Sequence, residues 1–272
     1  MRFAKLHGAG NDFLVFDGSQ DPALESTLAD LVPRLCDRRL GIGADGVLLA
    51  IPSGKAILRL GYWNADGSPA LFCANGTRCA ARFVAERWQW PGMTIVTGFA
   101  EIPAVVEGEL VTLELPAPTS IAPWRGFPAE GGTYRSRYLT VGVPQLVVPV
   151  EWRDFWRHDL SGLAPVLRSH PDLPPGGANV SFMQRDGDEL AVRSWERGIE
   201  GETLSCGSGD VACALIALAE GWHSSPISVR TASGRTLMIE AQAEPPQCPS
   251  RLTGPAEWVA EGEIAAELLA AP

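Results

Sequence analysis

Short apolar runs separated by turn residues alternate with amphipathic stretches along the first half of the chain. Runs at residues 13–18, 46–52, 56–63, 93–98 and 110–116 predict β-strands. Leu24, Leu28, Leu31 and Leu35 recur at helical spacing and predict a helix over residues 22–39. A second helix is predicted over residues 73–88, entered through the small-residue turn Ala74-Asn75-Gly76.

The second half of the chain shows the same alternation of short apolar runs, turn residues and amphipathic stretches. Strands are predicted at residues 139–143, 145–150 and 189–195, with helical segments over 159–169 and 208–220, and short strands at 233–242 and 257–268. Residues 116–132 are rich in Pro and Gly and form the best candidate for a linker. They divide the chain into predicted domains 1–117 and 118–272.

A weak internal repeat connects the two halves. Asn64 precedes Cys73 by nine residues, and Glu196 precedes Cys206 by ten. Each interval begins near a strand end with a Trp, ends at a cysteine beside small residues, and leads into a predicted helix. The repeat predicts two similar domains that face each other, with one cysteine from each.

Composition excludes several classes of protein. A net charge of -10 is opposite to the basic footprint that a nucleic-acid surface needs. No apolar run is long enough to span a bilayer, and residues 1–13 lack the apolar stretch of a signal peptide, so we expect a cytoplasmic protein without a membrane partner. In that compartment the six cysteines are expected as thiols, and without a C-x-x-C pair they predict no metal site.

Cys73 and Cys206 each stand at the predicted start of a helix. Backbone N–H groups and the positive end of the helix dipole meet there, so a substrate carboxylate is stabilised and a thiol pKa falls. Two such thiols on opposite faces of a carbon can invert it, one removing the α-proton as thiolate and the other returning a proton as thiol. This chemistry requires no cofactor.

The other cysteines have a simpler interpretation. Cysteine is among the most buried residue types, and a single cysteine near a helix start usually belongs to a core. We apply this to Cys36, Cys79, Cys213 and Cys248. The matched Gly-containing context of Cys73 and Cys206 is what favours chemistry for that pair.

Several blocks resemble those of diaminopimelate epimerases, in family order from residue 1 to about 257. They are His7-Gly8-Ala9-Gly10-Asn11-Asp12-Phe13, Gly41-Ile42-Gly43-Ala44-Asp45-Gly46, Asn64-Ala65-Asp66-Gly67-Ser68, Cys73-Ala74-Asn75-Gly76-Thr77-Arg78-Cys79, Glu196-Arg197-Gly198, Gly201-Glu202-Thr203, Cys206-Gly207-Ser208-Gly209 and Thr253-Gly254-Pro255-Ala256. The resemblance implies an α/β (α+β) fold of two pseudo-symmetric domains. Each would be a curved β-sheet wrapped around a central helix, with the active site in the cleft between them and the last ~12 residues packed back on the first domain.

The same resemblance implies a function and a set of site residues. Cys73 and Cys206 would be the catalytic acid and base of a cofactor-independent epimerisation of LL-2,6-diaminopimelate, serving lysine and peptidoglycan precursor synthesis in a homodimer. The implied contacts with the amino-acid substrate are Asn11, Asn64, Ala74, Asn75, Gly76, Asn179, Glu196, Arg197, Gly207 and Ser208. Glu196 would suit the α-ammonium group and Arg197 a carboxylate. From sequence pattern alone, a structural interpretation is favoured over a catalytic one: Asn11 and Asn64 as turn residues that bond their own backbone, and Glu196 and Arg197 as an exposed ion pair at a strand end.

The chain departs from the family pattern at its Gly-Asn-Pro-His motif, where Gly142-Val143-Pro144-Gln145 stands. Val143 offers no side-chain hydrogen bond and Gln145 cannot take a proton as His can. An unpaired buried polar group costs roughly 1–3 kcal/mol, about one or two orders of magnitude in substrate preference. Two alternatives therefore stay open: a racemase of another amino acid, such as histidine, and a non-catalytic amino-acid-binding protein.

Gly41, Gly43 and Gly46 match the letters of a dinucleotide-binding fingerprint but not its context. A helix precedes them and a strand follows, which is the reverse of the order that the fingerprint requires, so they predict a tight turn.

Overall fold

Two compact units make up the computed structural model, which describes residues 1–21 and 24–269. The first unit contains Met1–Leu113 and the segment from Gly254 onward, and the second contains Glu114–Thr253. The chain thus enters the second unit slightly before the predicted boundary at 117/118. It also leaves that unit at Thr253, earlier than a return limited to the last ~12 residues. The α/β class predicted from the family resemblance is confirmed.

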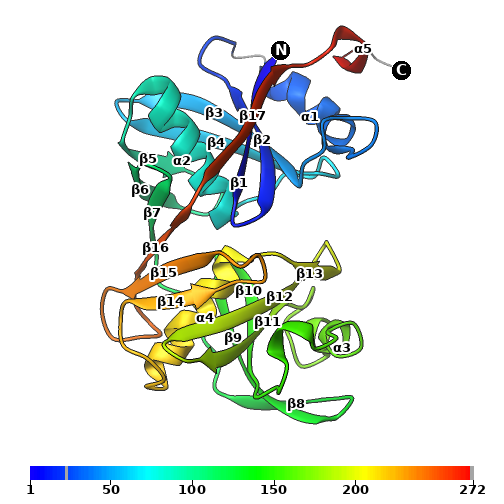
Figure 1. Ribbon diagram of the computed structural model, residues 1–272, viewed down its shortest axis with the longest axis vertical. Coiled ribbons are helices and arrows are strands. Elements are labelled where there is room, and N and C mark those ends of the chain that lie inside the picture. Colours follow the sequence, from blue (N-terminus) through cyan, green and yellow to red (C-terminus); the bar gives the residue numbers. More distant parts are fainter. Residues whose placement is uncertain (22–23, 270–272) are drawn as a thin grey trace. The chain divides into compact units, whose positions relative to one another are not determined.

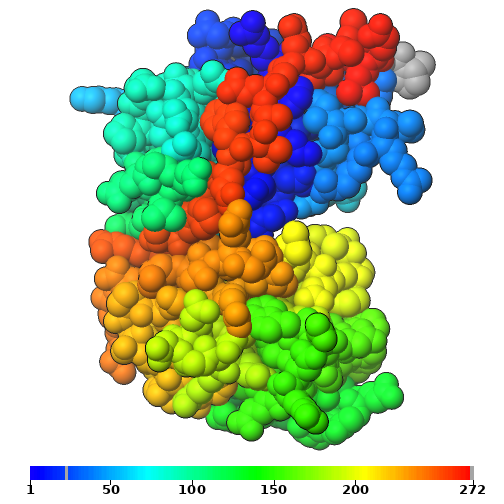
Figure 2. Space-filling view, in the orientation of Figure 1, coloured from blue at the N-terminus to red at the C-terminus, as the bar shows by residue number. Residues whose placement is uncertain are grey.

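The first unit is built on a sheet of eight successive strands. In spatial order they are β17 (Glu257–Glu263), β1 (Arg2–Gly8), β2 (Asn11–Asp17), β3 (Gly46–Gly54), β4 (Ile57–Asn64), β5 (Gly92–Val96), β6 (Glu101–Glu107) and β7 (Leu110–Leu115). The β2–β3 and β4–β5 pairs are parallel, and the others are antiparallel. Figure 1 shows β17 running beside β1, and in Figure 2 it lies on the surface of this unit.

The second unit repeats this topology. Its strands follow in the order β9 (Gly132–Val141), β10 (Val143–Pro149), β11 (Asn179–Asp186), β12 (Glu189–Glu196), β14 (Ile227–Arg230), β15 (Thr236–Ala241) and β16 (Ser250–Pro255). Counted from β9, the second pairing and the fourth are parallel and the rest antiparallel, as in the first unit when its pairings are counted from β1. Two short strands flank the series, β8 (Arg125–Ala129) on β9 and β13 (Gly201–Thr203) on β12. The shared pairing order confirms the two pseudo-symmetric domains.

One long helix packs against the sheet of each unit. In the first unit, α2 (Ala74–Trp88) follows β4 and contacts β1, β2, β3, β5 and β6. In the second, α4 (Gly207–Ala219) follows β12 and β13 and contacts β9, β10, β11, β12, β14 and β15. All residues of α4 from Gly207 to Ala217 are buried, as expected for a helix that is apolar on every side. These are the central helices that the resemblance implied.

The remaining helices are shorter or lie outside the sheets' centres. They are α1 (Leu24–Cys36), the 3-10 helix η1 (Phe155–Arg157), α3 (Ala164–Arg168) and α5 (Ala266–Leu269). The four leucines that predicted α1 are all buried, while residues 22–23 of the prediction lie outside the described residues. No helix among the described residues is long and apolar enough to cross a membrane.

Three sequence predictions need correction. The proposed linker 116–132 contains β8, because Phe127 is buried against the second unit's core and the segment pairs with β9. The helix predicted over 159–169 is limited to α3 after a turn. Residues 257–268 hold β17 and part of α5, not strand alone. The glycine turn at Gly41 and Gly43 is confirmed, since Gly43 has φ +80° and a Cβ on Gly41 would lie 2.1 Å from the Arg34 carbonyl oxygen.

Candidate active site

Cys73 is the N-cap of α2 and is partly exposed. Its backbone is extended, with φ -148° and ψ 116°, and its Sγ accepts a hydrogen bond from the Gly76 N–H at 3.5 Å. The Cys73 carbonyl accepts from the Thr77 N–H and hydroxyl, each at 2.8 Å. The thiol therefore occupies the position of a capping oxygen, over the first-turn amides of Ala74, Asn75 and Gly76.

The start of α2 packs tightly against its surroundings. A Cβ on Gly8 of β1 would lie 2.9 Å from the Asn75 carbonyl oxygen, and one on Gly76 would lie 3.3 Å from Phe13 and Leu48 atoms. Both positions therefore need the small side chain of glycine. This packing fixes the height of Cys73 above the sheet.

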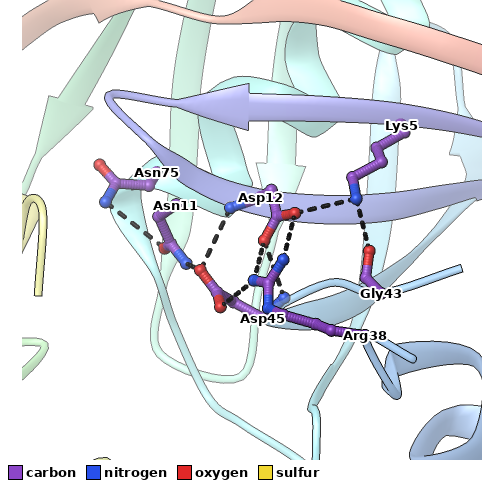
Figure 3. Close-up of polar contacts among 7 residues, drawn as sticks. All are labelled: Lys5, Asn11, Asp12, Arg38, Gly43, Asp45 and Asn75. Carbon is purple, nitrogen blue, oxygen red and sulfur yellow. Dashed lines mark hydrogen bonds and ion pairs between the residues drawn. The ribbon is translucent and has the colours of Figure 1, made fainter. Parts of the chain in front are cut away.

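The side-chain amide of Asn11 lies between Cys73, Asn75 and Asp45, and Figure 3 shows its contacts with the last two. Its Oδ1 is 3.6 Å from Cys73 Sγ and 3.5 Å from Asn75 Nδ2. Its Nδ2 donates to Asp45 Oδ2 at 2.7 Å. Asn11, Cys73 and Asn75, three residues of the predicted site, are thus brought together in the first unit.

A charged network lies behind Asn11 (Figure 3). Arg38 donates to Asp12 at 2.7 and 3.1 Å and to Asp45 at 2.7 Å, and Lys5 bonds to Asp12 at 3.1 Å and to the Gly43 carbonyl at 2.6 Å. Burial alone would raise the pKa of Asp12, but the hydrogen bonds and charges of Arg38 and Lys5 outweigh it and lower that pKa. The Asp12 carboxylate is therefore held as an anion.

Asn64 stands apart from this group, at the end of β4. Its Oδ1 accepts from the Tyr62 hydroxyl at 3.0 Å, and its Nδ2 donates to Ser68 Oγ at 3.1 Å. The following residue, Ala65, donates its N–H to the Asp45 carbonyl at 3.1 Å. Asn64 is thereby placed on the same loop cluster as Asp45.

Cys206 is the N-cap of α4 in the second unit, with only 5% of its surface exposed. Three side chains surround its Sγ: Ser208 Oγ at 3.6 Å, Asn179 Nδ2 at 3.7 Å and Gln145 Nε2 at 3.8 Å. Burial, followed by the negative charges of Glu196 and Asp210, raises the pKa of Cys206 well above its ordinary value. Cys206 is therefore present as the protonated thiol at neutral pH.

Gln145 is fully buried and belongs to a polar chain beneath Cys206. Its Nε2 donates to Ser208 Oγ at 2.9 Å, and its Oε1 accepts from Ser181 Oγ at 3.5 Å, which in turn bonds to Ser194 Oγ at 2.8 Å. Gly209 passes directly over this chain, since its Cβ would lie 2.3 Å from Ser181 Oγ. The departure from the family motif at Gln145 thus touches the thiol itself.

The ends of β11 and β12 hold the remaining predicted residues. Asn179 Oδ1 accepts the backbone N–H of Arg197 at 2.9 Å, and Glu196 Oε1 accepts from the Thr203 hydroxyl at 2.5 Å. Val143, the first residue of β10, is partly buried and pairs with Val141 of β9. Cys206, Gly207, Ser208, Asn179, Glu196 and Arg197 are therefore collected at one end of this unit's sheet.

Sequence analysis did not identify the charged groups that support Asn11. Asp45 stood inside a recognised block, but as part of a glycine turn, and Arg38 was not singled out at all. The signal was present, since Asp45 is an acidic residue within the small-residue stretch Gly41–Gly46. The predicted core cysteines Cys36, Cys79, Cys213 and Cys248 are all buried.

A separate pocket of about 550 Å³ lies in the second unit, lined by Trp156, Arg193, Glu202, Thr203, Leu204, Arg230, Thr231, Ala232 and Gly234. Arg193 donates to both oxygens of Glu202 at 2.7 Å, so its charge is already neutralised. Arg230 pairs with Asp186 and stacks on Trp156. Among the described residues, no group of three or more His, Cys, Asp and Glu is placed to hold a metal ion.

Known proteins resemble the chain in sequence over nearly its whole length. A family model described as diaminopimelate epimerase matches residues 3–92 and 137–259. The diaminopimelate epimerase of Methanocella arvoryzae is 36% identical, with 97% of this chain and 96% of the relative covered. That of Archaeoglobus fulgidus is 38% identical, with 96% and 95% covered.

Solved structures resemble the chain in fold. A phenazine biosynthesis protein of the PhzF family from Bacillus anthracis has a TM-score of 0.74 at 16% identity, covering 97% of this chain and 99% of that one. A probable proline racemase from Agrobacterium radiobacter, solved with bound carbonate, has a TM-score of 0.71 at 16% identity, covering 97% and 93%. At these identities the likeness concerns the fold.

Proposed function

Because the chain belongs to the diaminopimelate epimerase family of isomerases, we propose that it interconverts LL- and meso-2,6-diaminopimelate. One observation carries the proposal beyond family membership. Each of the two repeated units caps its central helix with a cysteine, Cys73 on α2 and Cys206 on α4. Matched thiols at matched positions suit a reaction whose two directions differ only in which face of the carbon is protonated.

The proposed mechanism uses the two sulfurs on opposite faces of the α-carbon. One thiolate takes the α-proton, and the electron pair of the broken C–H bond moves into the carboxylate. The other thiol gives its proton to the opposite face, and its sulfur becomes the thiolate. The helix starts at Ala74–Gly76 and Gly207–Ser208 hold the carboxylate with backbone N–H groups, where its added negative charge is stabilised.

The raised pKa of the Cys206 thiol is compatible with a role as the base in this mechanism. The α-proton is weakly acidic, and a thiolate whose conjugate acid has a high pKa is a stronger base. Cys206 has such a pKa through burial, while the N–H groups of Asn179 and Gln145 lie 3.7 and 3.8 Å from its sulfur to stabilise the charge when it forms. In this proposal Glu196 faces the α-ammonium group and Arg197 a substrate carboxylate.

A racemase of another amino acid is the second candidate. It is favoured by Val143 and Gln145, which replace the Asn and His that the family pattern has at these positions. Val143 is only partly buried and cannot hydrogen-bond the far end of diaminopimelate. In this alternative the two-thiol chemistry is unchanged, and only the distal contacts differ.

Proton exchange in heavy water separates the candidates. The reduced protein is incubated with single amino acids, among them LL-diaminopimelate and L-histidine, and loss of the α-proton signal is followed by NMR. Exchange of diaminopimelate is the expected result. Exchange of another amino acid alone supports the second candidate, and no exchange across a broad panel contradicts both and leaves an amino-acid-binding protein.

Single substitutions then test the two thiols. Cys73→Ala and Cys206→Ala are each expected to abolish racemisation, because each removes one of the two proton carriers. The matched control is Cys213→Ala, which removes a buried thiol in the same helix as Cys206. Full turnover in either of the first two variants would falsify the two-thiol mechanism.

A further inference from the structure

The amide of Asn11 has one orientation that satisfies its neighbours. Asp45 Oδ2 lies 2.7 Å from one end of the amide, and an ionised carboxylate only accepts hydrogen bonds. That end must therefore be the Nδ2 group of Asn11. The other end, which faces Cys73 Sγ at 3.6 Å, must be the carbonyl Oδ1.

A second, independent contact fixes the same orientation. Arg78 donates to Asn75 Oδ1 at 2.8 Å, and a guanidinium only donates. The other end of the Asn75 amide is therefore Nδ2, and it donates to Asn11 Oδ1 at 3.5 Å. Two charged groups, the acceptor Asp45 and the donor Arg78, thus agree on which end of Asn11 faces the thiol, and Figure 3 shows the contacts of Asn11 with Asp45 and Asn75.

Asp45 is itself held in place. Arg38 Nη2 donates to its Oδ1 at 2.7 Å, and the backbone N–H of Asp12 lies 3.3 Å from its Oδ2. The backbone N–H of Asp45 in turn donates to Asp12 Oδ1 at 3.1 Å. Each aspartate therefore caps the other's backbone, and rotation of the Asp45 carboxylate would break several bonds together.

We propose that Asp45 is a positioning residue that holds Asn11 with its carbonyl oxygen toward Cys73, so that Cys73 rests as the thiol. A carbonyl oxygen accepts an S–H bond and repels a thiolate, which counteracts the Gly76 N–H at 3.5 Å from the same sulfur. Its catalytic consequence rests on the proposed function: Cys73 would act as the proton donor once Cys206, itself a thiol at rest, has lost its proton to become the thiolate base. The Cys79 thiol on α2 interacts electrostatically with Cys73, Arg78 and Asp12, and Asn11 connects Cys73 to Asp45 and through it to Arg38.

The second unit presents the opposite end of an amide to its cysteine. Asn179 Oδ1 accepts the Arg197 backbone N–H at 2.9 Å, so Nδ2 is the end that faces Cys206 at 3.7 Å. An N–H group stabilises a thiolate when it forms, whereas the carbonyl of Asn11 does not. The two half-sites are therefore matched in position and opposite in the polarity of their amides.

The test is the thiol pKa of Cys73, which requires no turnover. In a Cys206→Ala background, the pH dependence of iodoacetamide labelling is measured at the Cys73 peptide by mass spectrometry. Asp45→Asn releases the constraint on Asn11 but also removes a negative charge. Asp12→Asn is the matched control, because it removes a charge from the same network and leaves the Asn11–Asp45 contact in place.

We expect the Cys73 pKa to fall further in Asp45→Asn than in Asp12→Asn, by about half to one unit, the size of one hydrogen bond. The difference should persist at about 1 M salt, where charge effects beyond about 3 Å are screened. Equal shifts in the two variants overturn the proposal. Because labelling is independent of substrate, this outcome is distinct from a failure of the proposed function.

A measurement on the unaltered network covers the case in which Asp45→Asn does not fold. The S–H stretching band of Cys73 is isolated as the infrared difference between the Cys206→Ala protein and the double cysteine variant. A thiol that donates to Asn11 Oδ1 gives a band shifted to lower frequency than that of an unbonded thiol. A band at the unbonded frequency contradicts the proposed orientation.

Discussion

Gln145 places an amide, not an ionisable ring, 3.8 Å from Cys206 Sγ. An amide keeps the same charge from acid to alkaline pH, so Gln145 adds no titration of its own beside Cys206, whose pKa is raised by burial and by the carboxylates of Glu196 and Asp210. Asp210 is tied to Ser205 at 3.0 Å, and Glu196 to Thr203 at 2.5 Å. The fraction of Cys206 present as thiolate should therefore rise in a single step as the pH increases.

Alkylation of Cys206 in the unliganded protein should rise steadily with pH. Because its pKa is raised above the ordinary thiol value of about 8.5, the thiolate is scarce at neutral pH and increases through the alkaline range. The check is labelling of the Cys206 peptide in a Cys73→Ala background, by mass spectrometry. A plateau below about pH 8.5 contradicts the predicted direction.

Substitutions at Gln145 test its contribution to this thiol. Gln145→Leu removes the N–H donor to both Cys206 Sγ and the Ser208 hydroxyl and raises the Cys206 pKa further, so turnover should fall about tenfold. Gln145→His adds a group that titrates near pH 6.5, and a new limb should appear in the pH–rate profile. A profile of Gln145→His that matches the original chain would show that this side chain does not affect the reaction.

Among single residues, the sequence indicated those whose role depends on the positions next to them in the chain. A cysteine before a small-residue turn and a helix predicted the caps at Cys73 and Cys206, and both are N-caps. The network behind Asn11 was not predictable in this way, because Asp45 lies 34 residues from Asn11 and its contact depends on the parallel pairing of β2 and β3. Pairing of distant strands is not encoded in any local pattern.

Each central helix meets its sheet with glycine at the point of closest approach. In α4 this is Gly209, whose Cβ would lie 2.3 Å from Ser181 Oγ and 3.1 Å from Ser194 Oγ. Ala is usually the better residue inside a helix by about 1 kcal/mol. Here overpacking at about 1–3 kcal/mol should exceed that gain.

Gly209→Ala should therefore lower the free energy of unfolding and reduce turnover, because Ser181 moves and Gln145 moves with it. The matched control is Gly92→Ala, at the start of β5, where nothing lies within 4 Å of an added Cβ. Denaturant unfolding and steady-state turnover are measured for both variants. If Gly209→Ala is as stable and active as Gly92→Ala, the close approach does not constrain the site.

Elements with a strong periodic pattern were predicted well, and edge elements were not. The leucines of α1 and the apolar runs of β3, β4 and β10 are recognisable in the sequence. Each of these elements buries one or both of its faces, and a buried face requires apolar residues at regular spacing. β8 was hidden inside a stretch with Pro and Gly, since it pairs with one strand only and buries Phe127 alone. An edge strand needs few apolar residues, so its pattern is weak.

The first unit is completed by the last strand of the chain. β17 pairs with β1 along its length, from Arg2 opposite Glu263 to His7 opposite Glu257, and the Ile264 N–H donates to the Met1 carbonyl at 2.9 Å. The repeat in the sequence predicted two similar domains but gave no sign that one of them takes a strand from the far end of the sequence. In the second unit the strand added beside β9 is β8, which comes directly before β9 in the chain, so the repeat could not reveal the distant origin of β17.

Removal of residues 257–272 should destabilise the first unit selectively. The deletion removes one of the two antiparallel partners of β1, at roughly 0.5–1.5 kcal/mol for each hydrogen bond lost, and leaves its pairing with β2. Hydrogen exchange resolved by peptide should show lost protection in β1 and β2 and unchanged protection in β11 and β12. A shorter deletion from Ala266 is the control, because it leaves β17 intact. Equal loss of protection in both units would contradict the assignment of β17 to the first.

The position of β17 also has a consequence during synthesis on the ribosome. The first unit emerges with the outer edge of β1 unpaired, and residues 114–253 must be translated before β17 appears. At about 5–20 residues per second, that interval is on the order of ten seconds. Throughout it the nascent chain carries an open strand edge able to pair with a neighbouring polypeptide. Slow translation of the second unit should therefore lower the yield of native protein, by aggregation through the first.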